Sequence, residues 1–170
     1  MPKIINLIEN KNRRYQTKFS FGATSAIITN LGIIVGLDTL THPKLSIIAG
    51  ILVVALADNI ADSFGIHIYQ ESECIDTKEV WFSTITNFFT RIFVSLTFIA
   101  LVAFLPLNLA LLCSVVWGLA LLSIVSYIIA KERKVNPYLA ILEHITIAVF
   151  VITLSHFLGR YVINKFIIAV

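Results

Sequence analysis

Two aspartates, Asp58 and Asp62, lie within an apolar run of the chain and are the residues best suited to do chemistry. Their spacing puts both carboxylates on one face of a helix, one turn apart. Carboxylates this close repel each other unless a cation or a shared proton lies between them. The pair therefore predicts a cation or proton site, since carboxylate oxygens are preferred ligands of hard cations.

A structural role for the same aspartates is the alternative. Arg91 lies in another apolar run, where an unpaired arginine would be costly. In this alternative Asp62 pairs with Arg91, and Asp58 hydrogen-bonds the first apolar segment. Glu143 of the last apolar segment is expected at a similar depth, so we interpret Arg91 and Glu143 as a structural ion pair.

Further polar residues repeat at helical spacing around the aspartates. Asn59, Ser63 and His67 form a stripe on the same predicted helix. The first apolar segment carries small and polar residues three or four positions apart, namely Gly22, Ser25, Thr29, Gly32 and Gly36, with Asn30 beside them. We predict that Thr29, Asn30 and Asn59 line a pathway, although small-residue faces of this kind serve close helix packing more often than ligation.

A short polar segment after the second apolar run carries four carboxylates: Glu71, Glu73, Asp76 and Glu79. On the cytoplasmic side, such a loop raises the local concentration of cations at the mouth of a pathway. An acidic solvated loop without a function fits the same residues equally well.

These residues require elements that hold them within a lipid bilayer. Of the 170 residues, 58% are hydrophobic and 14% are charged, and the mean hydropathy is +0.89. Such a chain has more apolar surface than a soluble domain can bury, and long apolar runs in lipid favour helices. We predict an all-α integral membrane bundle, residues 19–170, with five spans at 19–37, 45–69, 84–105, 108–130 and 138–159.

The distribution of Lys and Arg predicts the orientation of the bundle. With the N-terminus in the cytoplasm, nine of these residues lie on the inner side and three on the outer side, and Arg91 lies within a span. Residues 1–18 are then a cytoplasmic juxtamembrane segment, either a helix on the anionic leaflet or a frayed tail. This pattern fits a prokaryotic inner membrane and an organelle membrane alike.

Other classes of protein find little support in the sequence. The formal charge is only +3 and the basic residues are dispersed in short clusters, so nucleic acid is not an expected partner. Glycine-rich phosphate loops, paired CxxC motifs and serine nucleophile elbows are absent from the sequence, which argues against an enzyme. Cys74 and Cys113 fall in a polar loop and an apolar run, so two free thiols are expected.

Several stretches carry a resemblance to a known family: Phe21-Gly22-Ala23-Thr24-Ser25-Ala26 with the later Gly36, Ala57-Asp58-Asn59-Ile60-Ala61-Asp62-Ser63 followed by Tyr69, Ser72 and Glu73, the turn Leu105-Pro106-Leu107, and Leu158-Gly159-Arg160. They resemble the vacuolar iron transporter family, most strongly over the first two spans. The resemblance implies a five-helix homodimer that exchanges ferrous or related divalent metals for protons. It also implies metal ligands from the first two helices at the dimer interface.

The ligand set implied by the resemblance is altered in this chain. Asp58 matches the aspartate of the family's second span. Ser25 stands where the family has an aspartate, Ser63 where it has a methionine, and His67 where it has a glutamate. The expected metal site is thus Asp58, Asp62, His67, Ser25 and Ser63, which is harder and richer in oxygen because the thioether ligand is missing.

From these residues we expect a membrane transporter of divalent cations of the iron or manganese type. Proton antiport is a mechanism compatible with this expectation. A non-transporting membrane scaffold or partner subunit that retains the fold is the alternative. The expected partners are the lipid bilayer, a divalent cation, a proton and a second copy of the chain. Apart from the transported metal, no cofactor is expected.

Overall fold

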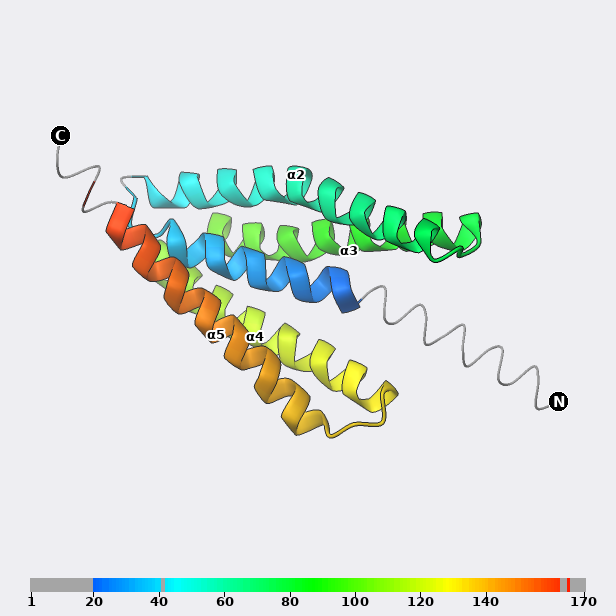
Figure 1. Ribbon diagram of the computed structural model, residues 1–170. Coiled ribbons are helices and arrows are strands. Elements are labelled where there is room, and N and C mark those ends of the chain that lie inside the picture. Colours follow the sequence, from blue (N-terminus) through cyan, green and yellow to red (C-terminus); the bar gives the residue numbers. More distant parts are fainter. Residues whose placement is uncertain (1–19, 41, 163–164, 166–170) are drawn as a thin grey trace.

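The computed structural model describes residues 20–40, 42–162 and 165, and this part of the chain is all-α (Figure 1). Five helices follow one another: a first helix Ser20–Gly36, α2 Pro43–Ser72, α3 Thr77–Phe104, α4 Leu107–Glu132 and α5 Pro137–Val162. The last four are long and apolar enough to cross a membrane, whereas the described first helix is shorter. The predicted all-α class and the number of helices are confirmed. The predicted segment 1–18 lies outside the described residues.

Helix α3 begins seven residues before the predicted start of the third span, at Thr77 rather than residue 84. The carboxylate of Asp76 accepts a hydrogen bond from the backbone N–H of Lys78 and so satisfies a free donor of the first turn. Val80 is fully buried, so this polar stretch also packs against the rest of the protein. The cap and the packing extend the helix beyond its apolar part.

The turns after α2 and after α4 share one backbone motif. Cys74 and Lys134 both have a positive φ, of 54° and 55°, and the next residue bonds back to the carbonyl five positions earlier. This arrangement satisfies the last carbonyls of each helix. Asp76 and Asn136 then accept hydrogen bonds from the backbone N–H two residues ahead. Both turns therefore reverse the chain within a few residues.

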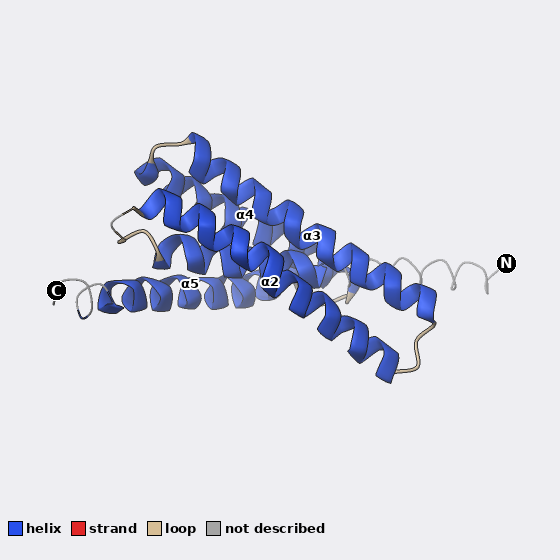
Figure 2. Ribbon diagram, turned by 90° about the horizontal axis from the view of Figure 1, so that it is seen from above, coloured by secondary structure: helices blue, strands red, loops and turns tan. Residues whose placement is uncertain are grey.

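The helices are arranged as two antiparallel pairs with the first helix between them (Figure 1). Among α2 to α5, the α2–α3 pair and the α4–α5 pair are in the most extensive contact, and α3 also contacts α4. Seen from above, the α2–α3 pair extends beyond the α4–α5 pair at the end where α2 turns into α3 (Figure 2). The first helix thus joins two hairpins that diverge at that end.

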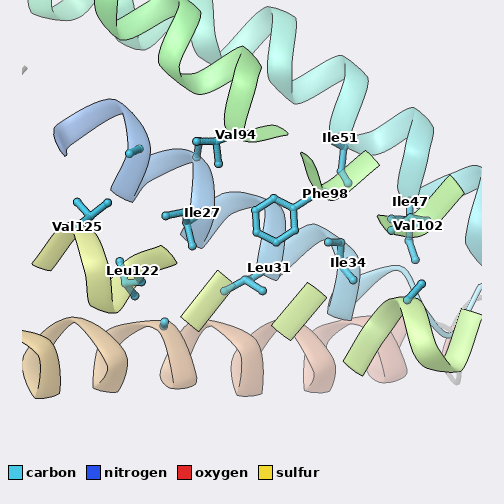
Figure 3. Packing of buried hydrophobic residues seen from close by; sticks show 14 residues of the cluster. Ile27, Leu31, Ile34, Ile47, Ile51, Val94, Phe98, Val102, Leu122 and Val125 are labelled. Atoms are coloured by element: carbon cyan, nitrogen blue, oxygen red, sulfur yellow. The ribbon is translucent and has the colours of Figure 1, made fainter. Parts of the chain in front are cut away.

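The apolar core surrounds the first helix, which contributes Ile27, Leu31 and Ile34 (Figure 3). Ile47 and Ile51 of α2 and the fully buried Phe98 of α3 close over it from one side, and Leu122 and Val125 of α4 from the other. Many large apolar side chains point outward instead, including Phe93, Phe104 and Phe150. A surface of this kind suits lipid rather than water, in agreement with an integral multi-pass membrane protein.

The first helix and α5 approach each other at their glycines. A Cβ atom built on Gly159 would lie 2.2 Å from the carbonyl oxygen of Gly36, which is far inside contact distance. A Cβ on Gly32 would lie 3.2 Å from Ser155 Oγ, and a Cβ on Gly36 would lie 3.5 Å from the Ser155 carbonyl oxygen, so these glycines also border α5. The close-packing role expected for these small residues is thus seen directly, and α5 is its partner.

Candidate functional site

Arg91 lies between the two aspartates that the sequence singles out. Its Nη2 donates to Oδ2 of Asp58 at 2.5 Å, and its Nη1 donates to Oδ2 of Asp62. One guanidinium on α3 therefore holds two carboxylates that stand one turn apart on α2. The cation that their spacing requires is supplied by the protein itself.

Ser25 brings the first helix into the same centre. Its Oγ accepts a hydrogen bond from Arg91 Nη1 at 2.6 Å and lies 3.3 Å from Asp62 Oδ2, to which it donates. Gly22, one turn earlier, leaves room for α3, since a Cβ there would lie 2.6 Å from Asn87 Oδ1 and 3.4 Å from Arg91 Cγ. Small residues on the first helix thus allow the arginine to reach the carboxylates.

The centre is asymmetric in its exposure and in its charge. The side chain of Arg91 is only 3% exposed, whereas those of Asp58 and Asp62 are 44% and 35% exposed. Each carboxylate bonds through Oδ2, and no partner for either Oδ1 is found among the described residues. Among the described side chains, two carboxylates thus share one guanidinium, which leaves one negative charge unbalanced.

The other polar residues of α2 point away from this centre and toward α3. Asn59 donates to the carbonyl of Phe88 at 2.9 Å, and Ser63 donates to Asn59 Oδ1 at 3.3 Å. Asn87 in turn donates to Ser63 Oγ at 3.0 Å. The predicted metal set is therefore divided: Asp58, Asp62 and Ser25 meet at Arg91, whereas Ser63 belongs to a buried hydrogen-bond network.

His67 is also separate from the aspartates. Its Nδ1 lies 2.9 Å from Thr84 Oγ1, and its Nε2 lies 3.3 Å from Oε1 of Glu71. The Thr84 hydroxyl already donates its hydrogen to the Val80 carbonyl, so His67 Nδ1 is the donor in that bond. Trp81 packs edge-on against the ring. Both ring nitrogens are thus engaged within the α2–α3 hairpin.

A small polar cavity adjoins the centre on the side of Asn30. Its volume is about 10 Å³, close to that of a single water site, and its polar lining is formed by Thr29, Asn30, Asn59, Arg91 and Ser95. Asn30 donates to Ser95 Oγ at 2.9 Å. The buried Nε of Arg91 has no hydrogen-bond partner among the described residues. All three residues predicted to line a pathway therefore border this cavity.

A much larger apolar groove lies beyond Thr29 and Val54, which border both spaces. It has a volume of about 830 Å³ and runs between the first helix, α2 and α5. Glycines form much of its wall: Gly32, Gly36, Gly50 and Gly159. Thr29 and Val54 thus separate the apolar groove from the polar cavity beside Arg91.

The predicted loop carboxylates have different surroundings. Glu71 lies beside His67, and Asp76 caps α3. Glu73 is exposed at the turn, and Glu79 lies in the first turn of α3. Glu143 is exposed on α5 and, within the described residues, does not pair with Arg91, whose ion-pair partners are Asp58 and Asp62.

Sequence reasoning identified Arg91 but overlooked the neighbours that share its face of α3. Ser83, Asn87 and Ser95 are buried like Arg91, and the four residues recur every four positions. This spacing is a signal for a polar helix face, and it was available in the sequence. The face bonds to α2 through Ser63 and Gln70, and to the first helix through Asn30.

Within the described ranges, no group of three or more His, Cys, Asp or Glu side chains is arranged to hold a metal ion. A cation at this centre would therefore have to bind the open Oδ1 atoms of Asp58 and Asp62, together with a hydroxyl or water. Comparison with known proteins found no matching family model, no matching curated protein and no matching solved structure.

Proposed function

We propose that the protein transports a divalent metal cation, of the iron or manganese type, across the membrane in which it is embedded. The observation that carries the proposal is the pair Asp58 and Asp62, whose side chains are 44% and 35% exposed and are bridged by the guanidinium of Arg91. An unbalanced carboxylate charge within an apolar helix is costly unless a cation or a partner faces it. Hard oxygen ligands on a half-exposed surface suit a divalent cation.

The proposal includes the arrangement in the membrane. Five crossings with a cytoplasmic N-terminus follow from the bias of Lys and Arg, and a homodimer is proposed because the carboxylates lie on an open face of the monomer. Exchange of the metal for protons is the proposed coupling. The resemblance of the first two helices to the vacuolar iron transporter family supports the same function.

Replacement of Asp58 by Asn tests this function directly. The variant removes one charge but keeps the shape of the side chain, so Mn²⁺ uptake into proteoliposomes should fall about tenfold or more. Glu143→Gln is the matched control, because it removes a carboxylate from the exposed face of α5 and should leave uptake unchanged. Equal uptake by wild-type protein and Asp58→Asn would refute this site.

A scaffold or partner subunit without transport is the second candidate, and the Arg91 bridge favours it. The bridge ties the first helix, α2 and α3 together, as a purely structural ion network does. The two functions differ in their response to metal. A transporter should be stabilised by about 2.7 kcal/mol when Mn²⁺ is present at a hundred times its Kd, measured by thermal unfolding, whereas a scaffold should show no shift.

A further inference from the structure

Arg91 occupies the position that a bound cation would take. Its two terminal nitrogens reach Oδ2 of both carboxylates, and it is almost completely buried against α2 and the first helix. The guanidinium lies toward the protein interior, whereas the carboxylates are partly exposed at the surface. A cation that arrives from the open side therefore meets the two Oδ1 atoms, which no described residue bonds, with the positive charge of Arg91 behind them.

The charge count decides what can be bound while Arg91 stays in place. Two carboxylates and one guanidinium sum to one negative charge, so adding a divalent cation leaves the centre with one positive charge. Charges of the same sign within a few ångströms repel strongly where water is scarce. Without the guanidinium, the same two carboxylates neutralise a divalent cation completely.

The surroundings of Arg91 are suited to a guanidinium that changes its bonds. Within the described part of the chain Nε has no hydrogen-bond partner, and Arg91 lines the small cavity together with Asn30, Asn59 and Ser95, whose side chains carry amide and hydroxyl oxygens. Gly22 leaves the stem of the arginine free of side-chain contact from the first helix at that position. Polar acceptors other than the two carboxylates thus lie beside Arg91.

We propose that Arg91 is a tethered internal cation that competes with the transported metal for Asp58 and Asp62. The inference rests on the proposed transport function and adds a residue to it. When metal is absent, Arg91 holds the carboxylates; metal binding requires that the guanidinium gives up its bonds to them. Arg91 therefore weakens metal binding and favours release of the metal, which an efficient carrier needs as much as uptake.

Mn²⁺ affinity of the full-length protein, measured by calorimetry in detergent, tests the proposal. Arg91→Met should bind Mn²⁺ about tenfold more tightly than wild type or better, because it removes the competing charge. Arg91→Lys keeps a positive charge and should bind nearer to wild type. Arg133→Met removes a cation from the turn after α4 and is the matched control, with no expected change in affinity.

A second comparison covers the case in which Arg91→Met does not fold because two unpaired carboxylates repel each other. Asp62→Asn and the double variant Asp62→Asn/Arg91→Met differ only at position 91, and neither leaves two unpaired carboxylates. Tighter Mn²⁺ binding by the double variant supports the proposal. A purely structural arginine predicts the reverse, with weaker binding and a lower unfolding temperature in the double variant.

The outcomes separate the two hypotheses. If wild-type protein binds Mn²⁺ and removal of Arg91 leaves the affinity equal or weaker in both backgrounds, Arg91 is no competitor, while the transport proposal stands. If wild-type protein does not bind Mn²⁺ but Arg91→Met does, the competition is supported and transport by the wild type is rejected. Absence of Mn²⁺ binding in every chain overturns both.

Discussion

Gly159 makes the closest approach between the first helix and α5, and its single hydrogen is what permits that approach. A methyl group there would lie 2.2 Å from the backbone oxygen of Gly36, and a backbone atom cannot move aside as a flexible side chain can. We expect Gly159→Ala to lower the free energy of unfolding by about 1–3 kcal/mol, as other overpacked sites do. Thermal unfolding of the purified protein measures this.

Gly65 is the matched control for that substitution. It also lies within a helix, but a Cβ there meets nothing within 4 Å. Alanine favours the helical backbone over glycine, so Gly65→Ala should be neutral or stabilise by up to about 1 kcal/mol. A similar loss of stability in both variants would show that the contact with Gly36 is not what makes position 159 sensitive to alanine.

The individual residues of the centre could be predicted from the sequence only in part. Asp58 and Asp62 stand out because charge within an apolar run is rare, and the pairing of Asp62 with Arg91 was one of the alternatives considered. That Arg91 bridges both aspartates depends on the rotation of α3 about its axis. This rotation is set by packing at Gly22 and Asn87 rather than by any local pattern.

Helix α4 contains two serines that are equally buried but differ in their hydrogen bonds. Ser126 donates to the Leu122 carbonyl and accepts from His144 Nδ1 at 2.7 Å, which connects α4 with α5. Ser114 is equally buried, but its hydroxyl has no partner among the described residues. The two positions therefore separate the effect of a hydrogen bond from that of burial.

We expect alanine to lower the thermal stability of the protein at position 126 but not at position 114. Ser126→Ala leaves the imidazole N–H of His144 without its acceptor and should destabilise the protein by about 1 kcal/mol. Ser114→Ala removes an unpaired hydroxyl and should be neutral or slightly stabilising. Equal destabilisation by both variants would mean that the hydroxyl–imidazole bond contributes nothing to the α4–α5 contact.

The extents of the elements were predictable where hydropathy defines them and not where capping does. The spans expected at 45–69 and 108–130 lie within α2 and α4. The early start of α3 depends on Asp76, whose carboxylate caps a polar turn. The turns at Cys74 and Lys134 use left-handed residues that are not glycine, so the usual signal for such a helix end was absent from the sequence.

The orientation of the whole molecule can be tested with its own cysteines. Cys74 is exposed in the turn between α2 and α3, whereas Cys113 lies on α4. If the N-terminus is cytoplasmic, a membrane-impermeant maleimide should label inside-out vesicles and spare right-side-out vesicles. Cys74→Ser should abolish the labelling and Cys113→Ser should not. Labelling of right-side-out vesicles at Cys74 would reverse the proposed topology.

For the whole molecule, the amino-acid composition was sufficient to predict a protein of apolar helices, but not how those helices pack against one another. A chain that is 58% hydrophobic predicts apolar helices, and the structure has them. The placement of the first helix between two hairpins depends on many small contacts, such as Leu31 against Gly118. No periodicity within one helix specifies its neighbours, because each apolar face could pack against lipid as well as protein.

The length of α2 has a consequence outside the lipid. Its 30 residues form a rod of about 45 Å, whereas the hydrocarbon layer is about 30 Å thick and typical tilts shorten the rod by only a few ångströms. If α2 crosses the membrane, we expect its polar last turns to protrude from the hydrocarbon layer, braced against α3 by the bonds from His67 to Thr84 and from Gln70 to Ser83. An antibody fragment raised against this tip should therefore bind an epitope that lies outside the detergent micelle.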